Sequence, residues 1–195
     1  MLILLILPVP AHDQESLDSA ENSFGIGLSS GYVAAGGDFG IYWHNSAHAG
    51  LSFRYPFHAH IPAFLTVSLS NHKPIDDPLP RPGYAAARSS VLLASSAVSW
   101  QYEPFLQKAI SPFAGGGINT HTWILYKSWP PDYNSDETEF GIHGAAGMRA
   151  YLARWCFGLE YRHYASFTRP HVIHDGSVLF TCEYLFELKG LNHGD

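Results

Sequence analysis

The stretch 155–164, "WCFGLEYRHY", alternates strictly between two kinds of side chain. Large apolar or aromatic residues occupy the odd positions, and small or charged residues, including Glu160 and Arg162, occupy the even positions. A period of two predicts a β-strand with one apolar and one polar face. In a soluble protein the apolar face would line the core, whereas in a membrane barrel it would contact lipid. The fold class therefore depends on which face of this strand points inward.

The composition favours a β-protein whose exterior is poor in charge. Of the 195 residues, 46% are hydrophobic, 14% are aromatic and only 14% are charged, whereas soluble domains carry roughly 25% charged residues. The formal net charge of -6 argues against a nucleic-acid partner. The two cysteines, Cys156 and Cys182, fall on opposite faces of their strands by the alternation, so we expect free thiols.

The N-terminus indicates export. Residues 1–11, "MLILLILPVPA", form a short apolar run with small residues before a cleavage position, and 12–22 form a polar lead. This pattern predicts a signal peptide, truncated or with a misassigned start because it has no basic residues. The alternative is a buried N-terminal strand. No later stretch reaches the roughly 18 apolar residues of a spanning helix, so a membrane location would require a closed barrel.

Alternating segments recur along the rest of the chain. We expect strands at 23–34, 47–57, 61–71, 88–102, 111–126, 139–152, 155–166 and 176–186. Each has at least the roughly nine residues that a tilted strand needs to cross a bilayer, whereas strands in soluble proteins average about five or six. The segments predict one barrel domain over 23–186, followed by a tail at 187–195.

The links between these segments alternate in length. The second, fourth and sixth are short, whereas the others are longer and mostly rich in turn-forming residues: 34–45, 72–87, 127–138 and 167–175. Short turns on one side and long loops on the other are typical of outer-membrane barrels, whose long loops face outward. The pattern predicts four long extracellular loops and two periplasmic termini.

The polar faces of the segments suit a barrel interior better than a surface in water. They carry mostly Ser, Thr, Gly and Ala, with few charges: Arg54, Arg149, Glu160, Arg162 and Glu183. Eight strands enclose an interior that side chains can just fill, and unpaired buried charges are costly. We therefore expect Glu160 and Arg162 to pair across the lumen with Arg149, Arg54 or Glu183. A soluble lipocalin-like or streptavidin-like barrel is the alternative.

Three stretches carry a family resemblance: "SPFAGGGINTHTW" (111–123), "EFGIHGAAGMRAYLARWCFGLEYRHY" (139–164) and "SVLFTCEYLF" (177–186). With them the chain resembles the small outer-membrane β-barrel family, the OmpA/OmpX-type proteins. The resemblance implies an all-β fold, an eight-stranded antiparallel up-and-down transmembrane β-barrel in the bacterial outer membrane. One departure is that nine residues follow Phe186, whereas the family often ends on the terminal aromatic.

Two groups of residues in the sequence could support chemistry. Some eight-stranded barrels are lipid A deacylases with a His-x-Ser pair and a glutamate; His163, Ser166 and Glu183 are the matching residues, but two residues separate the first two. His58 and His60 could offer two imidazoles to a metal ion, without a nearby carboxylate or cysteine. We therefore expect no catalytic residues, no metal site and no cofactor.

The resulting functional prediction is a monomeric, porin-like barrel without a large pore. Its polar lumen is packed, it contacts outer-membrane lipids, and its loops meet an unknown extracellular ligand or surface in a structural or adhesive role. A lipid A-modifying enzyme is the second hypothesis, and a soluble ligand-binding barrel is the third.

Overall fold

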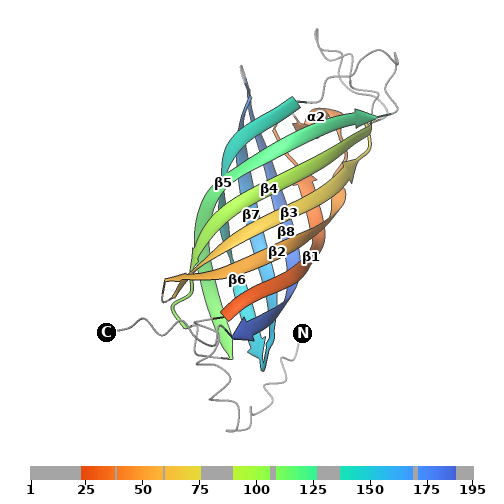
Figure 1. Ribbon diagram of the computed structural model, residues 1–195. Coiled ribbons are helices and arrows are strands. Elements are labelled where there is room, and N and C mark those ends of the chain that lie inside the picture. The colour runs from red at the N-terminus through yellow and green to blue at the C-terminus, as the bar shows by residue number, and fades with distance from the viewer. Residues whose placement is uncertain are drawn as a thin grey trace, which may run out of the picture.

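The computed structural model describes residues 23–37, 39–58, 60–75, 90–105, 109–126, 137–168 and 171–187. They form eight long strands and one short helix (Figure 1). The elements are β1 (Ser23–Ala35), α2 (Phe39–Tyr42), β2 (Ser46–His58), β3 (Ile61–His72), β4 (Ser90–Tyr102), β5 (Ile110–Tyr126), β6 (Glu137–Leu152), β7 (Trp155–Thr168) and β8 (His171–Glu187). No helix in these ranges is long and apolar enough to cross a membrane.

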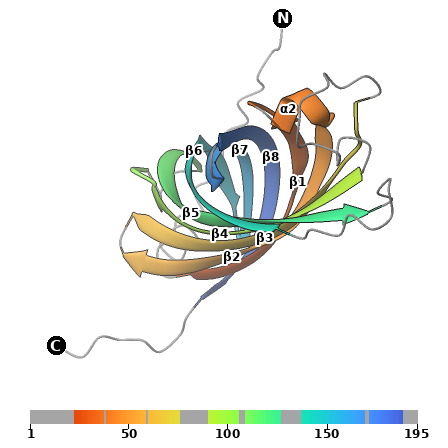
Figure 2. The same ribbon diagram turned by 90° about the horizontal axis from the view of Figure 1, so that it is seen from above.

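The strands close into a barrel in which each pairs antiparallel with its sequence neighbours. β1 and β8 complete the ring with a register that runs from Ser23 opposite Glu187 to Ala35 opposite Asp175. Figure 2 shows the ring from above, with α2 at its mouth. The prediction of an eight-stranded antiparallel up-and-down barrel is confirmed. The predicted signal peptide, the polar lead and nearly all of the C-terminal tail lie outside the described residues.

The two ends of the barrel differ in their connections. At the end where β1 begins and β8 finishes, here the terminal end, β2–β3 and β6–β7 are joined by turns in which His60 and Ala153 have φ angles of 61° and 51°. The opposite end carries α2 and is called the α2 end (Figure 1). The prediction of a long loop at 167–175 is wrong, because β7 and β8 remain paired up to Thr168 opposite His171. The Pro and polar residues of this stretch suggested a loop, but the antiparallel pairing of β7 with β8 extends into it from both sides.

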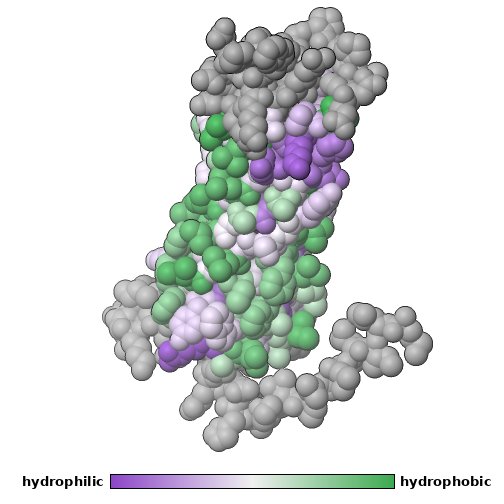
Figure 3. All heavy atoms as spheres, turned by 90° about the vertical axis from the view of Figure 1, so that its right-hand side faces the viewer, coloured by the Kyte–Doolittle hydropathy of each residue, from purple (hydrophilic) through white to green (hydrophobic). Residues whose placement is uncertain are grey.

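The outer wall of the barrel is apolar. Large hydrophobic side chains point outward all around the ring, and Leu28, Phe140 and Leu159 are 64%, 70% and 58% exposed. Figure 3 shows an apolar surface over the middle and lower wall, with hydrophilic residues gathered toward the α2 end. Every charged strand side chain that the structure describes is buried. A soluble barrel has the opposite arrangement, and monomeric soluble proteins rarely expose large apolar patches.

The glycine run at 115–117 allows β4 and β5 to approach closely. A Cβ atom built on Gly117 would lie 1.9 Å from the Val98 carbonyl oxygen. Gly144, on the outer face of β6, has nothing within 4 Å of such an atom. The run is therefore a packing feature of the wall.

Candidate functional site

The lumen is filled at the terminal end by a cluster around the Glu103 carboxylate. Arg149 and the Tyr151 hydroxyl both donate hydrogen bonds to this carboxylate. Arg54 Nη1 lies 3.7 Å from Glu103 Oε1 and donates to the Tyr151 hydroxyl over 2.9 Å. All four side chains are buried. The single Glu103 carboxylate therefore interacts with two guanidinium groups.

Glu103 enters the barrel from just beyond the end of β4. Its backbone N–H donates a hydrogen bond to the His60 carbonyl over 2.8 Å, which connects the end of β4 to the β2–β3 turn. Burial raises the pKa of Glu103, whereas the Arg149 and Arg54 guanidiniums and the Tyr151 hydrogen bond lower it, and the net shift is downward. The carboxylate is thus ionised within its pair of arginines.

Aromatic rings enclose the two guanidinium groups. The Arg149 guanidinium lies 4.0 Å from the ring centroid of Phe113 and 4.5 Å from that of Phe64. The Arg54 guanidinium lies 5.7 Å from the Phe64 ring. Such cation–π contacts stabilise a cation that has been removed from water.

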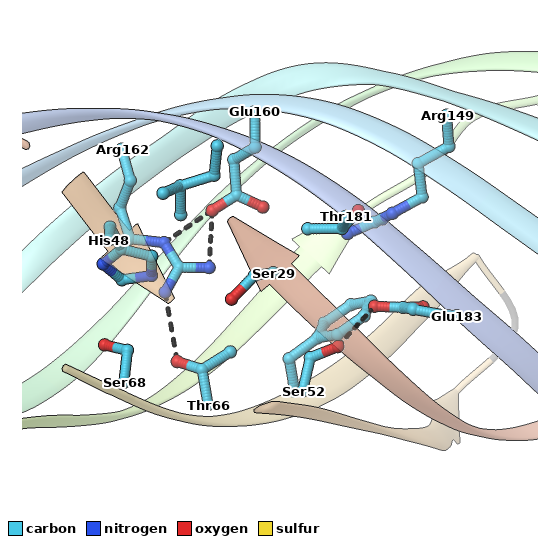
Figure 4. A pocket seen from close by; sticks show the side chains of 12 residues that line it. Ser29, His48, Ser52, Thr66, Ser68, Arg149, Glu160, Arg162, Thr181 and Glu183 are labelled. Carbon is cyan, nitrogen blue, oxygen red and sulfur yellow. Dashed lines mark hydrogen bonds and ion pairs between the residues drawn. The ribbon is translucent and has the colours of Figure 1, made fainter. Parts of the chain in front are cut away.

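A second pair fills the middle of the lumen (Figure 4). Arg162 Nε and Nη2 each lie 2.5 Å from Glu160 Oε1, and Arg162 Nη1 donates to Thr66 Oγ1 over 3.1 Å. On the same side of the ring, Ser52 donates to Glu183 over 3.0 Å. The cavity left between these groups is about 10 Å³, which holds about one water molecule.

Imidazoles gather in the lumen nearer the α2 end. The rings of His121 and His143 lie 5.0 Å and 5.5 Å from that of Tyr164, and Ser95 hydrogen-bonds His121 Nδ1 over 2.8 Å. Both ring nitrogens of His143 and both amide atoms of Asn119 are buried without a partner among the described residues. Buried polar groups are normally satisfied by protein or ordered water, so this part of the lumen offers hydrogen-bonding atoms to water.

An aromatic cluster occupies the mouth at the α2 end. Phe39, Tyr42 and Trp43, from α2 and the residue after it, pack on the inward-facing Val91, Leu93 and Trp123 of β4 and β5. The Phe39 ring lies 5.0 Å from Trp43 and 4.7 Å from Trp123. The backbone of this segment is tied to the chain after β3, because Ile75 N donates to the Tyr42 carbonyl over 2.9 Å. The first loop therefore folds into the barrel as an apolar plug.

The lumen charges predicted from sequence all lie inside the barrel, but their partners differ from the expected ones. Arg54, Arg149, Glu160, Arg162 and Glu183 are all buried. Glu160 pairs with Arg162 along its own strand, whereas cross-lumen pairing was expected. The sequence interpretation missed Glu103 because it assigned this residue to a turn. The available signal was parity, since Glu103 continues the inward positions of Ser99 and Gln101.

The residues considered for chemistry are not brought together. His163 is exposed on the outer wall, whereas Ser166 and Glu183 are buried in the lumen, so the three do not form a triad. His58 is exposed and His60 occupies the β2–β3 turn. Within the described ranges no group of three or more metal-ligating side chains is positioned to hold an ion. Cys156 and Cys182 are free.

Comparison with known proteins identifies the fold. No family model and no curated protein sequence matches the chain. Neisserial surface protein A superimposes with a TM-score of 0.61 at 14% identity, covering 84% of this chain and 97% of that one. OprG of Pseudomonas aeruginosa gives a TM-score of 0.57 at 15% identity, covering 87% and 99%. Ail of Yersinia pestis gives 0.51 at 13% identity, covering 84% and 97%. The chain has the fold of the small outer-membrane β-barrels.

Proposed function

We propose that the protein is an integral outer-membrane barrel that conducts no solute and acts as a rigid scaffold for its surface loops. The filled lumen carries this proposal. Between the Glu103 cluster and the Glu160–Arg162 pair lies a cavity of only about 10 Å³. The mouth above it is occupied by the cluster of Phe39, Trp43 and Trp123.

The apolar wall supports the membrane location. Closed barrels are one of the two structures that satisfy all backbone polar groups in lipid. In such barrels the short turns face the periplasm and the longer loops face outward, so the α2 end is the outer one. The segments 73–89 and 127–136 join strands at that end.

A surface-interaction role fits a scaffold without a channel. Function in such folds resides in loops carried by a rigid framework. Ail, a protein of similar fold named as an attachment invasion locus protein, has been crystallised with the heparin analogue sucrose octasulfate. We infer that this chain likewise uses its outer loops for contact with an extracellular ligand or surface, and that it has no catalytic role.

The test combines conductance with loop replacement. The refolded protein should show no steady ion conductance in planar bilayers. Replacement of residues 128–135 by a short Gly-Ser turn should leave heat-modifiable gel mobility unchanged while reducing the binding of expressing cells to a host or abiotic surface. Steady conductance of the unmodified protein, or equal binding after replacement of both 76–88 and 128–135, would overturn the proposal. A change in lipid A acylation upon expression, measured by mass spectrometry, would instead support the enzyme hypothesis.

A further inference from the structure

The outer wall of the barrel contains a recess near the α2 end, between β1, β7 and β8. Its volume is about 280 Å³, and its lining includes Tyr32, Tyr161, His163, His174, Gly176 and Val178. The recess exists because small residues such as Ala34 and Gly176 lie between the large side chains of Tyr32, Tyr161 and the two histidines. A Cβ atom on Gly176 would lie 3.2 Å from the Tyr161 hydroxyl, so glycine leaves room for this phenol.

Two histidines form the polar part of the recess. His163 of β7 and His174 of β8 are diagonal cross-strand neighbours, because His163 is opposite Gly176 and Ala165 is opposite His174. Their rings are stacked with centroids 5.5 Å apart and an interplanar angle of 16°. Both side chains are exposed, and none of the described residues makes a hydrogen bond or ion pair with either imidazole. Asp175 borders the recess, but its side chain is buried.

The height of the pair on the wall places it at a membrane surface. His163 is eight residues beyond Trp155 on β7; at about 3.3 Å per residue and a tilt of about 40°, this is roughly 20 Å along the membrane normal. The apolar band of such barrels is about 25 Å tall and ends in aromatic girdles. Trp155, near the terminal end, fits the inner girdle. The two imidazoles then lie close to the outer boundary of the band.

The wall on the inner side of the pair is apolar. Leu159, Val178 and Phe180 continue the same three-strand surface toward the terminal end and are 58%, 52% and 51% exposed. A lipid with its headgroup at the histidines would lay an acyl chain along these residues. Imidazole N–H groups and phenolic hydroxyls donate hydrogen bonds to oxyanions.

We propose that this recess is a binding site for the phosphate group of an outer-leaflet lipid, with His163 and His174 as the donors and Tyr161 and Tyr32 flanking the headgroup. The assignment to the outer leaflet rests on the proposed function. The bound group is a lipid phosphate ester; its source is the glucosamine phosphate of lipid A or the headgroup of a glycerophospholipid.

The experiment is ligand titration of the full chain in dodecyl maltoside, a detergent without phosphate. Histidine ring ¹⁵N NMR signals are followed while diphosphoryl lipid A, phosphatidylglycerol or phosphate-free diacylglycerol is added. We expect the signals of His163 and His174 to shift with a phosphate-bearing lipid and not with diacylglycerol. The more effective of lipid A and phosphatidylglycerol identifies the source.

Variants make the assignment specific. His163→Ala combined with His174→Ala should weaken the affinity at least tenfold, whereas His58→Ala, at the opposite rim, should leave it unchanged. Heat-modifiable mobility reports that each variant is folded. Equal affinity of the double variant, or shifts with diacylglycerol, would overturn the proposal, as would a response of this pair to Zn²⁺ but to no lipid. Because the measurement is made in micelles, its result is independent of the conductance and surface-binding tests above.

Discussion

Replacement of Glu103 by glutamine should destabilise the barrel far more than its position in a turn would suggest. In the lumen Arg54 and Arg149 both interact with the buried Glu103 carboxylate. Glu103→Gln keeps the side-chain shape and removes one negative charge. The Arg54 Nη1 to Glu103 Oε1 distance is 3.7 Å, which corresponds to roughly 4–5 kcal/mol at an effective dielectric constant of about 20. Measured costs of removing one partner from a buried pair are about 3–5 kcal/mol.

The assay is reversible urea unfolding in lipid vesicles, followed by tryptophan fluorescence. We expect Glu103→Gln to lose about 3 kcal/mol or more of unfolding free energy. Glu183→Gln is the matched control, because Glu183 is equally buried and accepts a hydrogen bond from Ser52 but, among the described residues, has no arginine nitrogen within 4.0 Å. It should lose about 1 kcal/mol. Adding Arg54→Met to Glu103→Gln should recover much of the loss, because it removes one of the two buried guanidiniums that have lost their carboxylate partner.

The reasoning would be refuted if Glu103→Gln and Glu183→Gln cost the same. In that case the total lumen charge, and not the contact with two guanidiniums, would determine the stability. A double variant no more stable than Glu103→Gln alone would likewise show that Arg54 is not paired with this carboxylate.

Further predictions concern acid, the strand wall, the mouth and the thiols. The pKa of Glu103 is lowered, so the ionised carboxylate stabilises the folded barrel fully above the unfolded-state pKa of about 4.3. This stabilisation is lost as the pH falls. The difference in unfolding free energy between wild type and Glu103→Gln should therefore narrow below about pH 4. Gly117→Ala should reduce the yield of heat-modifiable barrel, because the new Cβ would meet the Val98 oxygen at 1.9 Å, whereas Gly144→Ala should fold normally; equal yields would contradict this explanation. Trp123→Ala should cost about 3–5 kcal/mol in urea unfolding by opening the aromatic cluster, and an unchanged midpoint would show that the cluster contributes little. In the folded protein a membrane-permeant maleimide should label the outward Cys182 and not the buried Cys156, as mass spectrometry of digests would reveal.

The sequence was sufficient to predict the barrel because the alternation spans whole strands. Residues 155–164 obey the period of two throughout, and β7 begins at Trp155 as expected. The orientation of its faces followed from the composition of the polar side. Charged side chains that would be common on a water-exposed face are replaced there by Ser, Thr and Gly, with a few residues such as Glu160 and Arg162.

The contacts inside the lumen could not be predicted in the same way. Alternation says which way a side chain points but not which partner across the ring it meets, because partners depend on shear and on side-chain length. Glu103 was missed since it lies beyond the strand end, and the plug residues Phe39 and Trp43 were missed since a loop was expected to face water. The recess at His163 forms where the consecutive strands β7 and β8 meet β1 from the other end of the chain, so no local sequence pattern predicts it.

The inward face of β4 meets two different environments along its length. Val91 and Leu93 pack against aromatic rings, whereas Ser99 and Gln101 lie in the polar lumen. The barrel therefore has a polar interior and an apolar wall along most of its length, but a conventional hydrophobic core at its mouth. The segment 39–43 is part of that core and should tolerate few changes of sequence or length. If the α2 end faces outward as proposed, foreign sequences for surface display would be better inserted in the segment between Tyr126 and Glu137 than in the first loop.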